Sequence, residues 1–121
     1  MENENPKIEW LQRAKKDCLK FTFKETLTEQ NAIIAIQKWE KAFASKPEEK
    51  IIIIWDCSKM SGYSTKSRIL WQNALKEMKE QIDIIWLISQ SSLIKMGASV
   101  MGLFTSLKIK TVSKESEIKF T

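Results

Sequence analysis

The first clear element in the sequence is a half-exposed β-strand over roughly residues 18–24. Its apolar residues Leu19, Phe21 and Phe23 alternate with two lysines and a threonine. Alternation with a period of two places the apolar side chains on one face of a strand and the polar ones on the other. The preceding segment, residues 8–13, either pairs with this strand as a hairpin or forms a short helix, and its pattern leaves both open.

Two later runs are almost continuously apolar and predict strands that are buried on both faces. The run IIIIW ends at Asp56, and the run IDIIWLIS follows later in the chain. Continuous apolar strands are typical of a sheet with helices on both faces. We place these strands at residues 51–56 and 83–89, and a short final strand at residues 108–112.

Three segments repeat their apolar residues at helical spacing. The first begins after Thr28, which we expect to be an N-cap without a complete capping box, and it stops before Pro47. The second runs from about Thr65 to Gln81, and the third covers residues 91–107. In the third helix we expect the larger hydrophobic side chains to face the core: Leu93, Met96, Val100, Leu103, Phe104 and Leu107.

This order of elements predicts an α/β fold with a mixed, mainly parallel sheet of four or five strands and three main helices. Strands that alternate with helices along a chain are joined by right-handed crossovers in a parallel sheet. A chain of 121 residues is long enough to bury one such core without disulfides or metals. We expect one domain over residues 1–121, with its core at about residues 18–118 and residues 1–17 as an N-terminal extension or edge strand.

Charge and hydropathy exclude several classes of protein. The net charge is +5, but the 20 Lys and Arg residues are spread over the whole chain. Nucleic-acid binders usually concentrate such charge on one face, so we expect no nucleic-acid partner. The first residues, MENENP, are too polar for a signal peptide, and no apolar run approaches the ~20 residues of a membrane span. We therefore expect a cytoplasmic protein.

The residue types that are missing argue against most catalytic and cofactor sites. The chain has no histidine, two cysteines and three glycines. Ser-His and Cys-His pairs, a zinc site, a phosphate loop and a dinucleotide-binding motif are therefore ruled out, and we expect no metal and no cofactor. An acid-base enzyme that uses Asp56 with Tyr63 is one remaining alternative. A non-enzymatic binding or regulatory module agrees better with this composition.

Polar side chains gather after both buried strands and form the candidate site. At the carboxyl edge of a parallel sheet such residues meet, and the starts of helices favour anions. The competing interpretation is local: Ser64 or Thr65 caps the second helix, Asp56 closes an Asx turn, and Gly62 makes a turn with positive φ. The candidate partner- or anion-binding residues are Asp56, Ser58, Ser64, Thr65, Ser67, Ser91 and Ser92.

The segment WDCSKMSGYSTKSRILW resembles the STAS domain, and in particular its SpoIIAA-like branch, whose founding members are anti-anti-sigma factors. In that family a buried strand ends in Asp or Asn, and an Asp-Ser-Ser-Gly motif opens the next helix. Asp56 matches the strand-terminal acid. Thr65 stands at the position of the phosphorylatable serine of this motif, which makes it the possible phosphoacceptor. Ser64 stands at the position of the motif's Asp, and Ser67 at the position of its Gly.

The resemblance implies a bacterial-type regulatory module that acts by protein–protein interaction. We expect it to dock a protein partner or a second copy through an exposed loop at residues 57–64 and the starts of the second and third helices. The alternative is a carrier of a small apolar ligand or lipid. The third helix has more apolar surface than one buried stripe needs, and the SpoIIAA-like branch is similar to the lipid-binding domain of Sec14-type proteins, which suggests a pocket beneath this helix. Trp10 and Trp71 are expected to reach a surface.

Overall fold

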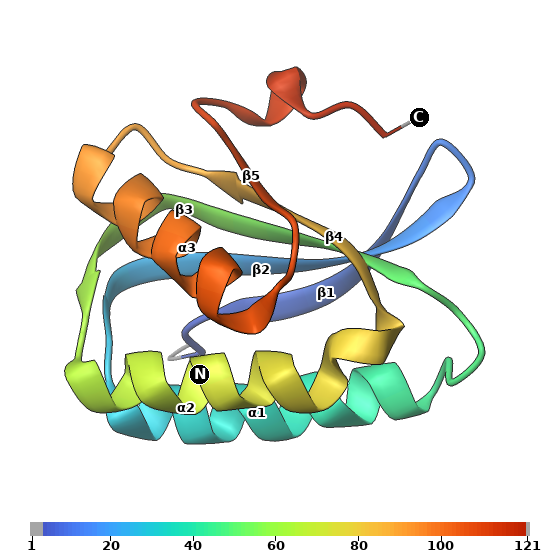
Figure 1. The fold of residues 1–121 in the computed structure, drawn as a ribbon, viewed down its shortest axis with the longest axis horizontal. Coiled ribbons are helices and arrows are strands. Elements are labelled where there is room, and N and C mark those ends of the chain that lie inside the picture. Colours follow the sequence, from blue (N-terminus) through green and yellow to red (C-terminus); the bar gives the residue numbers. More distant parts are fainter. Residues whose placement is uncertain (1–3, 121) are drawn as a thin grey trace.

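The computed structural model describes residues 4–120 and shows, within them, a five-stranded sheet and three α-helices (Figure 1). Two short 3-10 helices, Lys79–Gln81 and Glu115–Glu117, follow the second helix and the last strand. The elements in chain order are β1 (Lys7–Arg13), β2 (Lys16–Leu27), α1 (Glu29–Ala44), β3 (Ile51–Tyr63), α2 (Thr65–Met78), β4 (Ile82–Ile88), α3 (Ser92–Thr105) and β5 (Ile109–Val112).

The order of strands in the sheet is the order in the chain, β1-β2-β3-β4-β5. β1 runs antiparallel to β2, and all the other neighbours are parallel, which confirms the predicted mixed, mainly parallel sheet. The open alternative at residues 8–13 is resolved as a hairpin. Its two-residue turn, Ala14 and Lys15, has φ values of 52° and 66°, as a type I′ turn requires.

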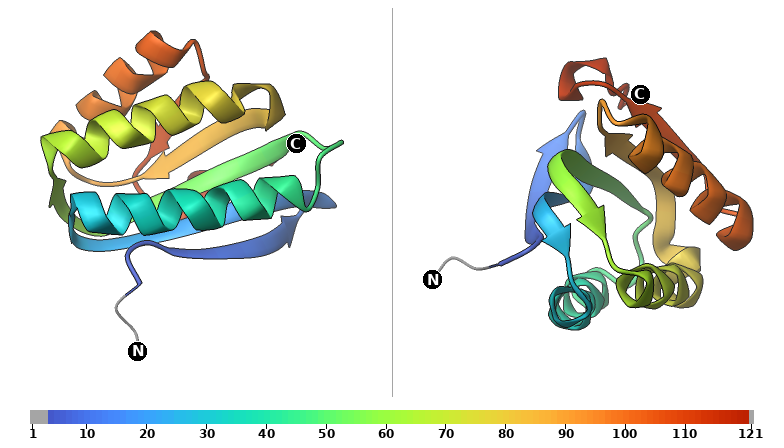
Figure 2. Two further views of the ribbon diagram at one scale, coloured as in Figure 1. Left: turned by 90° about the horizontal axis from the view of Figure 1, so that it is seen from below. Right: turned by 90° about the vertical axis from the view of Figure 1, so that its left-hand side faces the viewer.

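All three helices cover the same face of the sheet, so the expected two-sided coverage is wrong (Figure 2). The reason is topological. When each strand is added beside the previous one by a right-handed crossover, every crossover helix falls on the same side. The other face of β3 presents Ile52 and Ile54, and the C-terminal segment packs Ile118 and Phe120 against it. The unbroken isoleucine run is therefore buried by helices on one side and by an irregular segment on the other.

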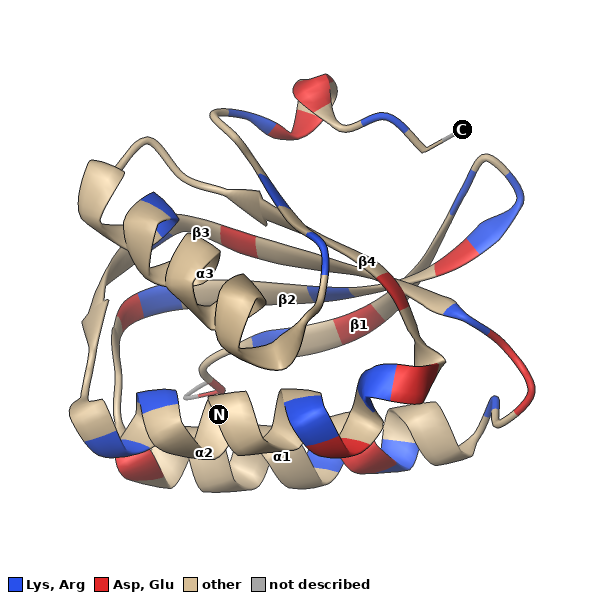
Figure 3. Cartoon of the chain, in the orientation of Figure 1, with Lys and Arg blue, Asp and Glu red and all other residues tan. Residues whose placement is uncertain are grey.

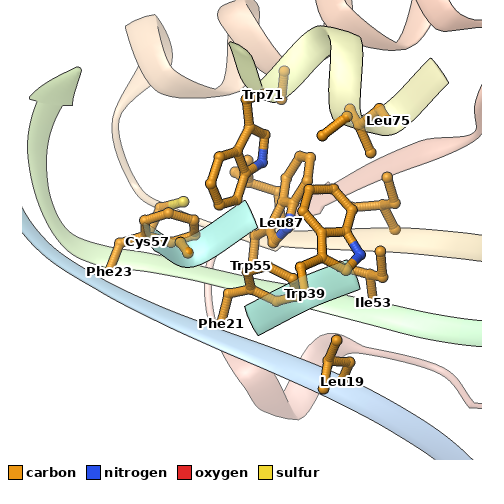
Figure 4. Packing of buried hydrophobic residues seen from close by; sticks show 14 of the residues in the cluster. Leu19, Phe21, Phe23, Trp39, Ile53, Trp55, Cys57, Trp71, Leu75 and Leu87 are labelled. Carbon is orange, nitrogen blue, oxygen red and sulfur yellow. The ribbon is translucent and has the colours of Figure 1, made fainter. Parts of the chain in front are cut away.

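The core on the helix side is built around aromatic rings (Figure 4). The ring centroid of Trp71 lies 5.2 Å from that of Trp39 and 5.8 Å from that of Phe21. Trp71 is only 4% exposed, so the expectation that it reaches a surface is wrong. Its position on the buried stripe of α2 directs the indole toward the sheet. Trp10 is half-buried, with the Lys46 ammonium 5.1 Å from its ring centroid.

β3 continues beyond its predicted end, so residues 57–63 are part of a strand and not a loop. β2 is also longer than expected, and the ladder between them extends through Lys24 opposite Lys59 to Leu27 opposite Tyr63. Backbone pairing does not depend on the polar side chains that suggested a loop. Gly62 does not have a positive φ, so the proposed glycine turn is also wrong.

Side chains cap the N-termini of all three helices. Thr28 caps α1: its hydroxyl accepts from the Asn31 backbone N–H, and the Asn31 side-chain oxygen accepts from the Thr28 backbone N–H. This closes a complete capping box, contrary to expectation, because an asparagine amide oxygen accepts that bond as Glu or Gln does. Ser64 caps α2 and Ser91 caps α3, with their hydroxyls accepting from backbone N–H groups at 3.1 Å and 3.3 Å.

α3 is rotated relative to the prediction. Its small or compact residues Ile94, Ala98, Gly102 and Thr105 face the core. Both sides of this helix are apolar, so periodicity alone did not distinguish them. The side with small residues faces the core because it lets the helix approach β5 closely. A methyl group on Gly102 would lie 3.1 Å from the carbonyl oxygen of Leu107. Most of the stripe expected to be buried is exposed: Leu93, Met96, Val100, Leu103 and Phe104.

Candidate functional site

Asp56 and Ser58 form a local hydrogen-bonded unit on β3. The Asp56 carboxylate accepts from the Ser58 backbone N–H at 3.1 Å and from its hydroxyl at 2.7 Å. Asp56 is also 4.0 Å from the Lys20 ammonium, which lies 3.0 Å from Glu115. Asp56 is two residues after Ile54 on β3, so the two side chains lie on the same face of the sheet. Ile54 packs on the face away from the helices, and Asp56 therefore lies toward that face. The carboxylate thus orients its own strand and the C-terminal segment.

At the start of α2, two of the hydroxyl groups make hydrogen bonds within the protein and a third is exposed. The Ser64 hydroxyl is the N-cap. Ser67 is fully buried, and its hydroxyl donates to the backbone oxygens of Ser64 and Leu27 at 2.8 Å and 3.1 Å. Thr65, the possible phosphoacceptor, is exposed at the first position of the helix.

The start of α3 repeats this arrangement. Ser89 is buried, and its hydroxyl accepts from the Ser91 backbone N–H at 3.0 Å. Ser91 in turn caps the helix, and Ser92 is exposed. Of the seven predicted residues, only Ser67 lines the hollow between the two helices. That they bind a partner or an anion stays a prediction.

The hollow that does lie between α2, α3 and the sheet is an apolar cavity of about 60 Å³. Strand residues form its floor, among them Phe23, Trp55 and Leu87. α2 contributes Trp71, and α3 contributes its inward side: Ile94, Gly97, Ala98 and Met101. The carrier hypothesis expected a pocket beneath the third helix, and this cavity lies in that place.

The exposed side of the cavity is marked by its less buried lining residues. Tyr63 at the end of β3 is 38% exposed, and Met60 and Arg68 are half-buried. A methyl group on Gly97 would lie 2.4 Å from the Tyr63 phenol oxygen. The tyrosine therefore reaches across from the sheet to α3, and Gly97 provides the space for its hydroxyl.

Two of the lining residues, Trp55 and Cys57, have buried polar groups. Trp55 is 4% exposed, and its indole N–H has no hydrogen-bond partner among the described residues. Buried indole N–H groups usually find an acceptor. The Trp39 N–H is unpartnered as well, but Trp39 does not line the cavity, whereas Trp55 does. Cys57 is also buried, and desolvation, assisted by the Asp56 charge, raises the pKa of its thiol to about 12. Cys57 is therefore a neutral wall residue at physiological pH and not a nucleophile.

Asp56 and Tyr63 do not share a cleft. Seven residues of extended strand separate their Cα atoms by about 20 Å, and Asp56 lies toward the face opposite the helices. The acid-base alternative needs these groups within reach of one substrate. Their separation along β3 removes that support.

Comparison with known proteins gives a match in structure only. No family model and no curated protein matches the sequence. The fold is similar to a crystal structure of an uncharacterised protein of the DUF3478 family from Shewanella loihica PV-4, described as SpoIIAA-like. The TM-score is 0.80 at 16% identity, over 97% of this chain and 93% of that one. This chain has a SpoIIAA-like fold. The resemblance seen in the sequence is therefore confirmed for the fold.

The residues that sequence reasoning missed are those that make the cavity. No sequence signal shows that the Trp55 N–H lacks an acceptor. The glycine at position 97 and the tyrosine at position 63 become related only when β3 and α3 are placed side by side. One signal was present: the apolar excess of the third helix, which suggested a second apolar surface.

Proposed function

We propose that this protein is a non-enzymatic binding protein whose ligand is a small apolar molecule with one hydrogen-bond acceptor. The observation that carries this proposal is the unpartnered Trp55 N–H beside the apolar cavity between α2 and α3. A buried donor without a partner costs about 1–3 kcal/mol. A ligand that places an acceptor against this N–H recovers that free energy, and its hydrocarbon part fits the surrounding walls.

An organic ligand agrees with the cavity better than a lone water molecule. An ordered buried water needs about two to four polar partners. The lining has two hydroxyl groups, those of Ser67 and Tyr63. The Ser67 hydroxyl is already bonded to two backbone oxygens, and the Tyr63 hydroxyl lies against Gly97 on α3. A water beside Trp55 would therefore be left with unsatisfied bonds in apolar surroundings.

The size of the cavity limits the class of ligand. Its volume of about 60 Å³ is less than half of the ~150 Å³ engineered cavity that holds benzene. Short alkyl chains with a terminal carbonyl, hydroxyl or carboxylate therefore suit it better than rings or long lipids. Arg68 at the rim adds a positive charge and favours the carboxylate.

The test is a titration followed by the Trp55 indole resonance in ¹H–¹⁵N spectra. The probes are 1-pentanol, 2-pentanone and pentanoate. We expect saturable shifts of the Trp55 indole signal. Trp55→Phe, followed through the indole signal of Trp71, which also lines the cavity, should weaken binding by about tenfold because it removes the donor and keeps an aromatic ring. Ala98→Leu should abolish binding because it fills the cavity. Ala44→Leu, the same change at an exposed position of α1, is the matched control.

Shifts that persist in Ala98→Leu, or no shift at Trp55, would contradict the proposal. Native mass spectrometry of freshly purified protein adds an independent observation. A co-purifying small molecule that is absent from Ala98→Leu supports the ligand role, and its mass identifies the chemical class.

A second candidate is the docking of a protein partner through the starts of α2 and α3. One observation favours it: Ser64 and Ser91 take the capping bonds, which leaves Thr65 and Ser92 exposed at two positive helix ends. The exposed Thr65 is a place where a partner or a phosphate would be accommodated.

Substitutions at Thr65 test this second candidate. Thr65→Ala should change the free energy of unfolding by less than about 0.5 kcal/mol, because Ser64 supplies the cap. Thr65→Asp should fold equally well but reduce recovery of a protein partner in a pull-down from the native cell, because it places a negative charge at the contact. Full recovery of the same partners by Thr65→Asp would exclude docking at this position.

A further inference from the structure

The outer side of α3 is a large exposed apolar surface. Its five side chains, called here the outer stripe, are exposed as follows: Leu93 78%, Met96 62%, Val100 45%, Leu103 82% and Phe104 64%. At 100° per residue these positions fall within an arc of about 100° on the helix. Single exposed hydrophobic residues are common, whereas an aligned group of five marks an interaction surface.

The charged side chains along α3 and β5 have one sign. Residues 84–114 contain no Asp or Glu, and their four charged side chains are Lys95, Lys108, Lys110 and Lys114. Figure 3 shows α3 and β5 with blue residues and no red ones, whereas both colours occur on α1 and α2. Lys95 lies on α3 itself, half-buried and near Ser113 at 3.4 Å, and Lys108 is exposed directly after the helix.

We infer that the outer stripe of α3 docks this protein on an anionic lipid surface. An amphipathic helix with an apolar side and flanking lysines lies in the plane of a membrane interface, with its apolar side among the acyl chains and its lysines among anionic headgroups. Contact would be peripheral, because no helix among the described residues is long and apolar enough to cross a bilayer.

A second copy of the chain is a poorer occupant on grounds of charge. A two-fold interface places the same patch against itself. Because residues 84–114 contain four lysines and no acid, such a contact would bring like charges together. An anionic lipid surface offers the opposite charge over the whole patch.

The area of the stripe also argues against a stable protein interface. A 14-residue helix is about 21 Å long and 10 Å wide, so it covers on the order of a few hundred Å². A stable interface buries about 800 Å² on each partner. A membrane has no such minimum area, because each inserted side chain adds its own transfer free energy.

The test is co-sedimentation of the full chain with vesicles of phosphatidylcholine, with and without phosphatidylserine. We expect binding only to the phosphatidylserine vesicles, and we expect it to weaken as salt is raised. Leu103→Gln with Phe104→Gln should reduce the partition coefficient by at least about tenfold. The control pair is Ile33→Gln with Ile34→Gln, two exposed isoleucines of α1.

The charge contribution is tested with a second pair of variants. Lys95→Gln with Lys108→Gln should reduce partition by roughly tenfold. The control, Lys16→Gln with Lys41→Gln, removes two exposed lysines from the β1–β2 hairpin and α1. Circular dichroism and the melting temperature verify that each variant is folded.

Three results would overturn the inference: no sedimentation with anionic vesicles, equal binding to phosphatidylcholine alone, or a dimer in light scattering that the Leu103/Phe104 pair abolishes. The vesicle assay needs no small ligand in the cavity, and Ala98→Leu leaves the outer stripe unchanged. Failure of membrane docking and failure of the ligand proposal are therefore distinguishable.

Discussion

Replacing Trp71 with alanine is expected to lower the free energy of unfolding by about 3–5 kcal/mol, the cost of deleting a buried aromatic side chain. The Trp71 ring contacts four other aromatic rings from β2, α1 and β3, with centroid distances of 5.2 to 6.3 Å. Its removal leaves a large void next to the existing cavity, and these tightly packed rings can close it only in part. Urea unfolding followed by circular dichroism measures the loss.

Ile69→Ala on the same helix is the matched control. Ile69 is 47% exposed, so the change should cost less than about 1 kcal/mol. A Trp71→Ala protein that loses no more stability than Ile69→Ala would show that the aromatic cluster does not hold α2 on the sheet. Because Trp71 lines the cavity, the same variant should also accept larger ligands than the wild-type chain does.

The second large effect concerns the Cys57 thiol. Burial raises its pKa from 9.0 to about 12, so at about pH 8 its thiolate fraction falls by roughly a thousandfold. Alkylation of Cys57 by iodoacetamide should therefore be at least about a thousandfold slower in the folded protein than in the urea-unfolded chain. Mass spectrometry of the digested protein reads this site separately from Cys18. Alkylation within tenfold of the unfolded rate would show that the cavity wall is open to solvent.

The raised pKa also predicts how stability depends on pH. Below about pH 9 the thiol is protonated in both states, and its contribution to stability is fully present. Between pH 9.0 and about 12 the unfolded chain releases the proton while the folded protein retains it, so stability falls as pH rises. The slope is about 1.4 kcal/mol per pH unit, which gives roughly 2–3 kcal/mol between pH 8 and pH 11.

Cys57→Ala isolates this contribution from that of every other ionisable group. Urea unfolding of both proteins at several pH values should show the wild-type chain losing this additional stability and the variant not losing it. Equal pH dependence in the two proteins would mean that Cys57 ionises as readily in the folded state as in the unfolded one.

The sequence by itself determined the fold class and most of the element order. Residues 51–55 and 84–88 contain no polar position, and this pattern is typical of strands in the interior of a sheet. The helical stripes of α1 and α2, with Trp39 and Phe43 in the first and Ala74 and Leu75 in the second, lie in the core. These signals are strong because they repeat over several turns and each one agrees with its neighbours.

The candidate site could be predicted only in part. The serines before α2 and α3 were recognised, but which hydroxyl caps a helix and which one is exposed depends on the residue at which the helix begins. Sequence patterns locate that residue only to within a few positions, and here a shift of one position exchanges the roles of Ser64 and Thr65. The end of β3 was missed because polar side chains do not prevent backbone pairing with β2.

Only the tertiary structure decided what α3 does. Its two sides are both apolar, so its rotation depends on which side packs more closely against β4 and β5. Ala98 and Gly102 allow that approach, and the bulkier Leu103 and Phe104 are left in solvent. The cavity and the unpartnered Trp55 N–H follow from the same packing. A pattern of hydrophobicity shows how apolar each side of the helix is. Which side packs against the sheet depends on how closely the side chains of the helix and the sheet fit together, and that fit is defined only in the folded structure.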